Sequence, residues 1–179
     1  GHGLLLRLMQ TTGELASQTY AEADSPLSRS VRGAVGGEIG GAVFAVFTLW
    51  FTTSLDSPGK AALLMISTVA TGSGSIESGS ANVATGVLVH LALSAAYGVI
   101  FAQFVDRMRT NATLLLTAGL YGLLIYAVNF QILSPLYFHA FQDANQPFML
   151  LVHIIYGQLL VVIFVSRGVR SREPRFLWR

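Results

Sequence analysis

The stretch RGAVGGEIGGAVFAVF, residues 32–47, places five glycines within nine positions of an otherwise apolar run. Gly33, Gly37 and Gly41 recur at every fourth position, so they share one face of a helix. Such a face lets a second helix backbone approach closely, as small residues do between membrane helices. The stretch therefore predicts a tightly packed helix. Its glycine face meets either another helix of the same chain or a helix of another subunit.

The composition of the whole chain is typical of a polytopic membrane protein. Of its 179 residues, 53% are hydrophobic and 11% are charged, whereas soluble domains carry about 25% charged residues. The chain has no cysteine, which excludes disulfides, thiolate catalysis and cysteine-ligated metal centres. Its basic residues form no stripe interleaved with aromatic residues, so we expect no nucleic-acid partner.

Four stretches are long and apolar enough to cross a bilayer, which needs about 20 residues per helix. They are roughly 33–55, 83–105, 111–133 and 147–166. A fifth stretch, AALLMISTVAT at 61–71, has eleven residues and favours a re-entrant or interfacial segment. The predicted fold is an all-α integral membrane protein, a four-transmembrane-helix bundle with this additional segment.

Polar segments flank the predicted transmembrane domain, which we place at 31–167. Residues 1–30 form a polar cytoplasmic segment, where an amphipathic surface helix could use Leu4, Leu5, Leu8 and Met9. Residues 168–179 form a basic cytoplasmic tail.

The basic residues are distributed unevenly about the four predicted spans. With four spans, the N-terminus, the 106–110 loop and the C-terminus lie on one side of the membrane. That side carries all ten arginines: Arg7, Arg29, Arg32, Arg107, Arg109, Arg167, Arg170, Arg172, Arg175 and Arg179. Lys60 is the single basic residue of the other side. The positive-inside rule therefore predicts two cytoplasmic termini, with segments 56–82 and 134–146 outside.

Two of the predicted spans each contain one histidine in an apolar run. They read GVLVHLALSAAYGVIFA at 86–102 and LLVHIIYGQLLVVIF at 150–164. One span separates them, so the two helices run parallel, and each histidine lies about two turns from the outer surface. Gly86, His90, Ser94 and Tyr97 share one face of the first helix. The candidate polar or ligand site comprises His90, Ser94, Tyr97, Asn129, His153 and Tyr156.

Four uses of these histidines remain open from the sequence. They could ligate haem b axially, or bind copper or zinc with His139 as a third ligand. They could line a path for protons or substrate. The favoured interpretation is structural, with hydrogen bonds that join the helices, and it requires no cofactor. The expected partners of the histidines are Ser94, Tyr97, Tyr126, Asn129 and Gln158.

Glu38 lies within the glycine-rich span, about two turns from its predicted cytoplasmic end. A carboxylate inside a membrane is costly and usually faces a partner or water. Glu38 is therefore a candidate proton or cation site. The favoured alternative is pairing with Arg32, Arg107 or Arg109, or simple hydration near the interface.

The sequence contains no HExxH, GxSxG or P-loop motif, and the predicted spans contain no paired acidic motif. We therefore expect a non-catalytic accessory or scaffolding subunit, whose partners are the lipid bilayer and either itself or another membrane subunit. One alternative is a small transporter or channel that uses Glu38 and the histidines. Another is a bis-histidine haem b protein for electron transfer.

Three phrases resemble those of small uncharacterised bacterial inner-membrane proteins. They are the pattern from Gly86 to Ala102, GLLIYAVNFQILSPLYF at 122–138, and VHIIYG at 152–157. The similarity covers roughly residues 33–166. The resemblance implies a bacterial four-helix protein of the inner membrane, and it implies no activity and no functional residue.

The arginine asymmetry gives a prediction of topology. A single cysteine introduced as Ser78→Cys should react with a membrane-impermeant thiol reagent added from outside intact cells, because residues 56–82 lie on that side. The natural absence of cysteine makes the labelling specific. Reporter fusions at the C-terminus should report a cytoplasmic location. Labelling of Ser78→Cys only after access from the cytoplasmic side would contradict the four-span topology.

Overall fold

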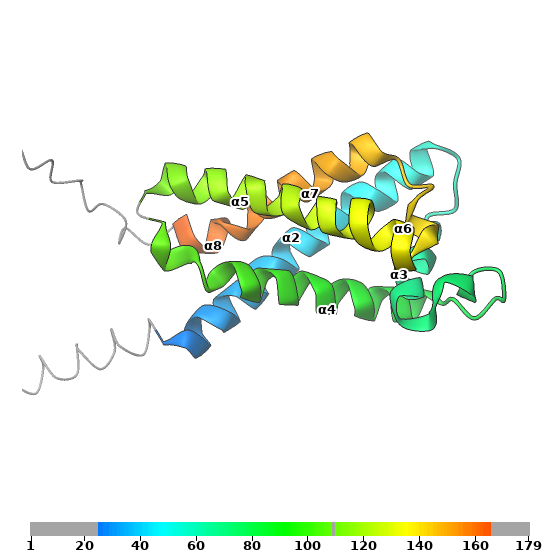
Figure 1. Ribbon diagram of the computed structural model, residues 1–179, viewed down its shortest axis with the longest axis horizontal. Helices are drawn as coiled ribbons and strands as arrows, with labels where there is room; N and C mark the ends of the chain where they lie inside the picture. The colour runs from blue at the N-terminus through cyan, green and yellow to red at the C-terminus, as the bar shows by residue number, and fades with distance from the viewer. Residues whose placement is uncertain (1–24, 109, 166–179) are drawn as a thin grey trace, which may run out of the picture.

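The protein is a bundle of helices (Figure 1). The computed structural model describes residues 25–108 and 110–165, and it contains no strand within these ranges. Four helical stretches are long and apolar enough to span a membrane: Pro26–Ser54, Val83–Arg107, Asn111–Tyr137 and Gln146–Val165. A short apolar helix, α3, covers Ala61–Thr71. The prediction of an all-α chain with four long apolar helices is confirmed.

The long stretches are built from several helical elements. The first is the single helix α2 (Pro26–Ser54), and the short helix η1 (Ser73–Ser75) follows α3. The second joins α4 (Val83–Ala102) to η2 (Val105–Arg107). The third comprises α5 (Asn111–Tyr126), η3 (Ala127–Leu133) and α6 (Ser134–Tyr137). After η4 (His139–Phe141), the fourth comprises α7 (Gln146–Leu160) and α8 (Val162–Val165).

Helix α2 begins seven residues before the predicted boundary at 33. The Ser25 hydroxyl accepts a hydrogen bond from the Ser28 N–H, and Pro26 occupies the first turn, where its missing N–H costs nothing. Residues 26–30 of the predicted polar segment therefore belong to the first turns of α2. Glu38 lies twelve residues from Pro26, about 18 Å along the axis, and close to the helix midpoint. The predicted surface helix at residues 4–9 and the basic tail at 168–179 lie outside the described residues.

The third stretch continues to Tyr137, four residues beyond its predicted end. Pro135 has no N–H, and its ring would clash with the carbonyl of Gln131 in a regular α-helix. The chain accommodates the proline through a π-helical turn, η3, in which the Ser134 N–H bonds to the Asn129 carbonyl five residues back. The wider turn lets the helix continue and turns Asn129 and Phe130 toward the interior.

The four long stretches pack in a definite order. Helix α2 contacts both α4 and α7, and α7 contacts α5, while α3 packs against α4. Helices α4 and α5 make few direct contacts with each other. One end of the bundle holds the start of α2, the turn between α4 and α5, and α8, whereas α3 and α6 lie at the other end (Figure 1). Helices α4 and α7 run in the same direction, as predicted from the sequence.

The glycine face of α2 meets α4 of the same chain. A β-carbon on Gly37 would overlap the Ser94 carbonyl, one on Gly33 the Gly98 carbonyl, and one on Gly41 the Ser94 hydroxyl. The remaining two glycines of this stretch, Gly36 and Gly40, face Leu160 and Tyr156 of α7. Glycine at these positions therefore brings α2 against both of its neighbours.

The two halves of the bundle differ in how completely they are filled. The half near the α4–α5 turn has a continuous apolar core that includes Phe101, Leu114, Leu160 and Phe164, each at most 3% exposed. A salt bridge from Arg29 to Asp106 joins the start of α2 to that turn. The half near α3 and α6 contains a smaller buried cluster of Phe130, Met149 and Val152, and a cavity lies beside it.

The glycine contact gives a prediction of stability. Gly37→Leu should lower the free energy of unfolding in detergent by one to a few kcal/mol, because the added side chain has no space against Ser94. Ala42→Leu is the matched control, since Ala42 is exposed on the same helix. Equal unfolding free energies for the two variants, from denaturation followed by circular dichroism, would contradict the packing described above.

Candidate functional site

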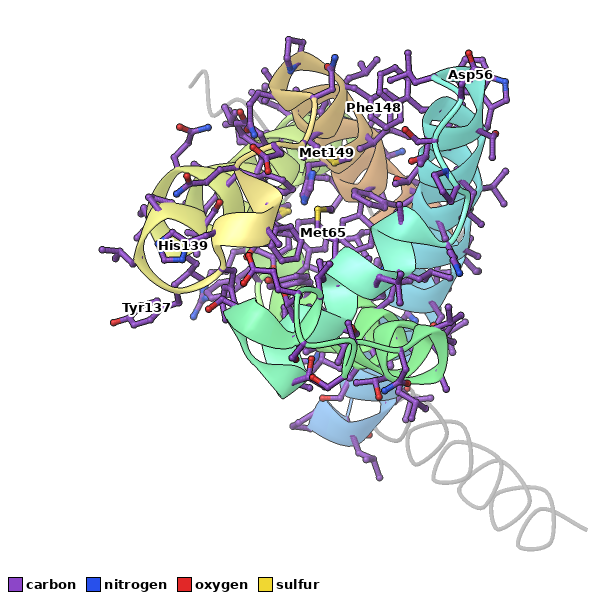
Figure 2. The ribbon with its side chains drawn as sticks, turned by 90° about the vertical axis from the view of Figure 1, so that its right-hand side faces the viewer. Asp56, Met65, Tyr137, His139, Phe148 and Met149 are labelled. Atoms are coloured by element: carbon purple, nitrogen blue, oxygen red, sulfur yellow. The ribbon has the colours of Figure 1, made fainter. Side chains whose placement is uncertain are left out.

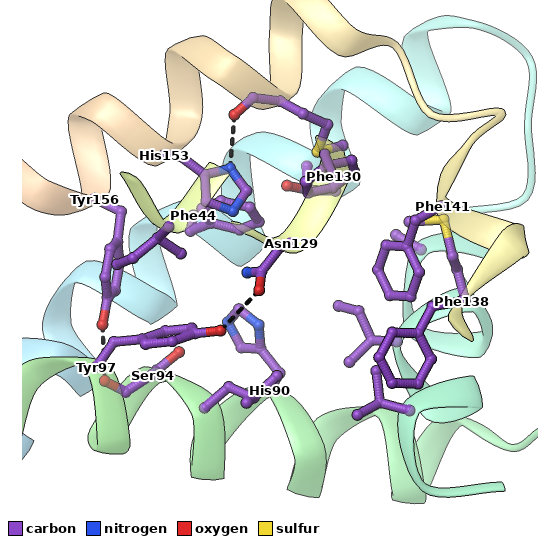
Figure 3. Close-up of a pocket in the computed structure, with 18 of the residues that line it drawn as sticks. Phe44, His90, Ser94, Tyr97, Asn129, Phe130, Phe138, Phe141, His153 and Tyr156 are labelled. Atoms are coloured by element: carbon purple, nitrogen blue, oxygen red, sulfur yellow. Dashed lines mark hydrogen bonds between the residues drawn. The ribbon is translucent and has the colours of Figure 1, made fainter. Parts of the chain in front are cut away.

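A cavity of about 160 Å³ lies between the helices in the half of the bundle nearest α3 and α6 (Figure 3). Its wall is mainly aromatic and aliphatic, and every long helical stretch contributes to it together with α3. All six residues grouped from the sequence as a candidate polar site line this cavity: His90, Ser94, Tyr97, Asn129, His153 and Tyr156. The structure thus brings these residues together from α4, η3 and α7.

His90 is held by the backbone of α2. Its Nε2 lies 2.9 Å from the Gly41 carbonyl oxygen, a contact that depends on the close approach of α4 to the glycine face. A carbonyl oxygen only accepts, so Nε2 carries the proton and donates it. In the neutral ring Nδ1 is then a bare acceptor.

His153 is held by its own helix. Its Nδ1 lies 2.7 Å from the Met149 carbonyl oxygen one turn earlier, so Nδ1 carries the proton and Nε2 is the bare nitrogen. Aromatic rings surround the imidazole, with centroids at 4.9 Å for Phe44, 5.4 Å for Phe130 and 6.0 Å for Tyr126. The Phe44 ring also lies 5.9 Å from His90, so one phenylalanine contacts both imidazoles.

The histidines do not form the hydrogen bonds predicted for them. Within the described chain, neither ring bonds to Ser94, Tyr97, Tyr126, Asn129 or Gln158, because both rings bond to backbone carbonyls instead. The expected partners are occupied elsewhere. The Tyr97 hydroxyl donates to Asn129 Oδ1 at 2.9 Å, and the Tyr126 hydroxyl donates to Gln146. The Gln158 amide donates to the Leu115 carbonyl.

The cavity is closed toward the α4–α5 turn. The Tyr156 hydroxyl donates to the Ser94 carbonyl at 2.7 Å and so joins α7 to α4. The Tyr121 hydroxyl donates to the Tyr97 carbonyl at 2.9 Å. The buried core around Phe101 and Leu160 lies between these bonds and the α4–α5 turn. No continuous polar path therefore leads from the cavity to that end through the described residues.

Two of the predicted site residues do not reach the cavity. Glu38 is partly buried on α2, is not among the lining residues, and forms no ion pair with any residue in 25–108 or 110–165. The expected pairing with Arg32 or Arg107 is therefore not present, and Arg109 lies outside the described residues. His139 is exposed at the edge of the α3–α6 end, while Met65 and Met149 lie near its centre (Figure 2).

The arrangement does not fit the cofactors considered from the sequence. The described residues include no group of three or more histidine, aspartate or glutamate side chains placed to hold a metal ion. A cavity of about 160 Å³ resembles in size an engineered cavity that takes up benzene, which is far smaller than a porphyrin. The Phe44 ring, moreover, packs against both imidazoles. Haem b therefore does not fit between them.

Sequence reasoning missed three contributors to the wall. Phe44 follows the glycine face by one turn but carries no motif of its own. Met65 enters from α3, a segment whose length predicted a re-entrant or interfacial location. Thr48 lies against the cavity with 5% exposure, and its hydroxyl has no hydrogen-bond partner among the described residues. Only its place in an otherwise apolar run could have drawn attention to it.

Comparisons with known proteins identify no relative of this chain. No family model, curated protein or solved structure matches the chain.

The bond between Tyr156 and Ser94 gives a prediction of stability. Tyr156→Phe removes a buried hydroxyl donor without changing the ring, and should lower the unfolding free energy by about 0.5–1.5 kcal/mol. Tyr137→Phe is the matched control, because Tyr137 is 63% exposed, and should change it by less than about 0.5 kcal/mol. Chemical denaturation in one detergent compares them, and similar losses from both variants would refute a stabilising role for the bond.

Proposed function

We propose that this chain is an integral membrane protein that binds a small, mainly apolar molecule in its cavity and does not transform it. The observation that carries the proposal is the cavity itself. It combines apolar and aromatic walls with a few convergent polar groups, which is the usual composition of small-molecule sites.

The surface of the bundle supports insertion in a bilayer. Large apolar side chains are exposed along every long helix, among them Val46 at 66%, Leu88 at 67% and Leu116 at 66%. A soluble protein rarely exposes apolar surface on this scale, whereas lipid tails would cover it. Of the described basic residues, Arg29 and Arg32 lie near the start of α2 and Arg107 ends η2, whereas Lys60 caps α3. The start of α2 and the turn after α4 lie at one end of the bundle, and α3 lies at the other (Figure 1). This asymmetry favours an orientation with both termini in the cytoplasm and α3 on the outer side. The bacterial inner membrane is the location that the resemblance implies.

The position of the cavity favours a site reached from the outer half of the membrane. It lies near α3 and α6, while packed side chains fill the half near the arginines. A transporter or channel would need a polar route through that filled half, and Glu38 does not supply one, since it is outside the cavity. Ligand binding on one side therefore accounts for the geometry better than passage through the bundle.

A second candidate function, an accessory or scaffolding subunit, is favoured by Glu38. This carboxylate lies near the midpoint of α2 beside the exposed residues Val35, Ile39 and Ala42. A carboxylate at such a depth usually faces a partner. A second copy of the chain, or a helix of another membrane subunit with a hydrogen-bond donor, would supply one.

The binding proposal is tested with p-xylene, a small aromatic hydrocarbon. We expect saturable binding to the purified protein in nanodiscs, measured by a ligand-dependent rise in melting temperature. A ligand at 100 times its Kd stabilises the folded state by about 2.7 kcal/mol. Val69→Phe should abolish the effect, because Val69 lines the cavity and a larger ring there would fill it.

Ala70→Phe is the matched control for this experiment. It introduces the same ring at the next residue of α3, which is exposed, so p-xylene binding should persist. This control also accounts for p-xylene dissolved in the lipid. An absence of saturable binding, or an equal response from Val69→Phe and Ala70→Phe, would overturn the proposal.

A further inference from the structure

We propose that the ligand of this cavity is an aromatic ring bearing hydroxyl groups, whose O–H groups donate hydrogen bonds to His90 Nδ1 and His153 Nε2. The inference rests on the proposed function, that the cavity binds a small molecule, and it specifies the chemistry of that molecule.

The two backbone carbonyls fix the role of each imidazole. Gly41 holds the protonated Nε2 of His90, and Met149 holds the protonated Nδ1 of His153. In its neutral form, each ring therefore keeps one bare acceptor nitrogen. The structure therefore presents two hydrogen-bond acceptors, although histidine in general can donate as well.

Both bare nitrogens are available to a ligand. Neither has a hydrogen-bond partner in the described part of the chain, neither is a fully buried atom, and both rings line the cavity. A bare nitrogen that found no donor would forfeit a hydrogen bond inside a largely apolar space. Water or a ligand hydroxyl must therefore meet this need.

The rest of the wall selects an aromatic ring. Phe44, Phe130, Phe138 and Phe141 line the space (Figure 3), and aromatic rings favour edge-to-face or offset contact with one another. The volume of about 160 Å³ suits a guest of about the size of benzene. A single substituted benzene ring thus matches both the shape and the surface of the cavity.

The polar groups exclude the main alternatives. None of the described residues that line the cavity is Lys, Arg, Asp or Glu, so neither an anion nor a cation finds an opposite charge. A ligand whose only polar groups are carbonyl oxygens would place acceptors against the bare nitrogens, which are also acceptors, so no hydrogen bond would form. A hydroxyl group, by contrast, donates to an imidazole and can accept from the Asn129 amide, whose oxygen already accepts from Tyr97.

The test compares two ligands of the same shape, hydroquinone and p-xylene, which differ only by hydroxyl against methyl groups. Each is titrated under reducing conditions into wild type, His90→Phe and His153→Phe in nanodiscs. Each substitution keeps an aromatic ring and removes one acceptor. We expect about tenfold weaker hydroquinone binding in each variant, equivalent to about 1.4 kcal/mol, and p-xylene affinity within about twofold of wild type.

His139→Phe provides the matched control, because His139 is exposed and does not line the cavity. It should leave the affinity for both ligands unchanged. If p-xylene binds but hydroquinone has the same Kd in wild type, His90→Phe and His153→Phe, the inference is overturned while the proposed function stands. If p-xylene does not bind to wild type, the proposed function falls, and the inference that rests on it falls as well.

A second measurement uses only the wild-type protein, in case a variant does not fold. Nitrogen NMR of protein labelled with ¹⁵N-histidine should show His90 and His153 as neutral rings of opposite tautomers. Hydroquinone should shift the resonances of their bare nitrogens, His90 Nδ1 and His153 Nε2, whereas p-xylene should shift them little. Identical responses to the two ligands, or two doubly protonated rings, would overturn the inference.

Discussion

The close approach of α2 to α4 is the contact on which the rest of the structure depends. In the bilayer proposed for this chain, apolar side chains gain little by leaving lipid for the interior of a bundle, so association relies on dense packing and hydrogen bonds. Gly33, Gly37 and Gly41 meet this requirement because they leave the backbone of α4 directly against that of α2. The same approach brings the Gly41 carbonyl within reach of His90. The packing of α2 against α4 therefore also positions His90 in the site.

The cavity follows from the order in which the helices pack. Helix α2 lies against α4 and α7, and α7 lies against α5, which leaves α4 and α5 with few mutual contacts. Tyrosines bridge the resulting gap at mid-bundle, where Tyr97 bonds to Asn129 and Tyr121 bonds to the Tyr97 carbonyl. Toward α3 and α6 the described residues form no such bridge, and the cavity lies there. These tyrosine hydrogen bonds therefore determine how far the cavity extends toward the α4–α5 turn.

Much of this architecture could be predicted from hydropathy and spacing. The four long helices, the short helix at 61–71 and the shared location of His90 and His153 all follow from apolar length and helical periodicity. Two boundaries were missed because local chemistry overrides hydropathy. Ser25 and Pro26 begin α2 among polar residues, and Pro135 widens a helical turn without ending the helix. The second effect matters most, since it turns Asn129 and Phe130 into the cavity.

The hydrogen bonds of the histidines could not be predicted, and the reason is physical. Sequence reasoning looks for partners among polar side chains, yet every residue carries a backbone carbonyl, so Gly41 and Met149 give no signal. A side-chain partner such as serine could donate or accept and would leave the tautomer open. A carbonyl can only accept, and so it determines which nitrogen keeps its proton. The packing that positions each ring therefore also determines the chemistry that the ring offers to the cavity.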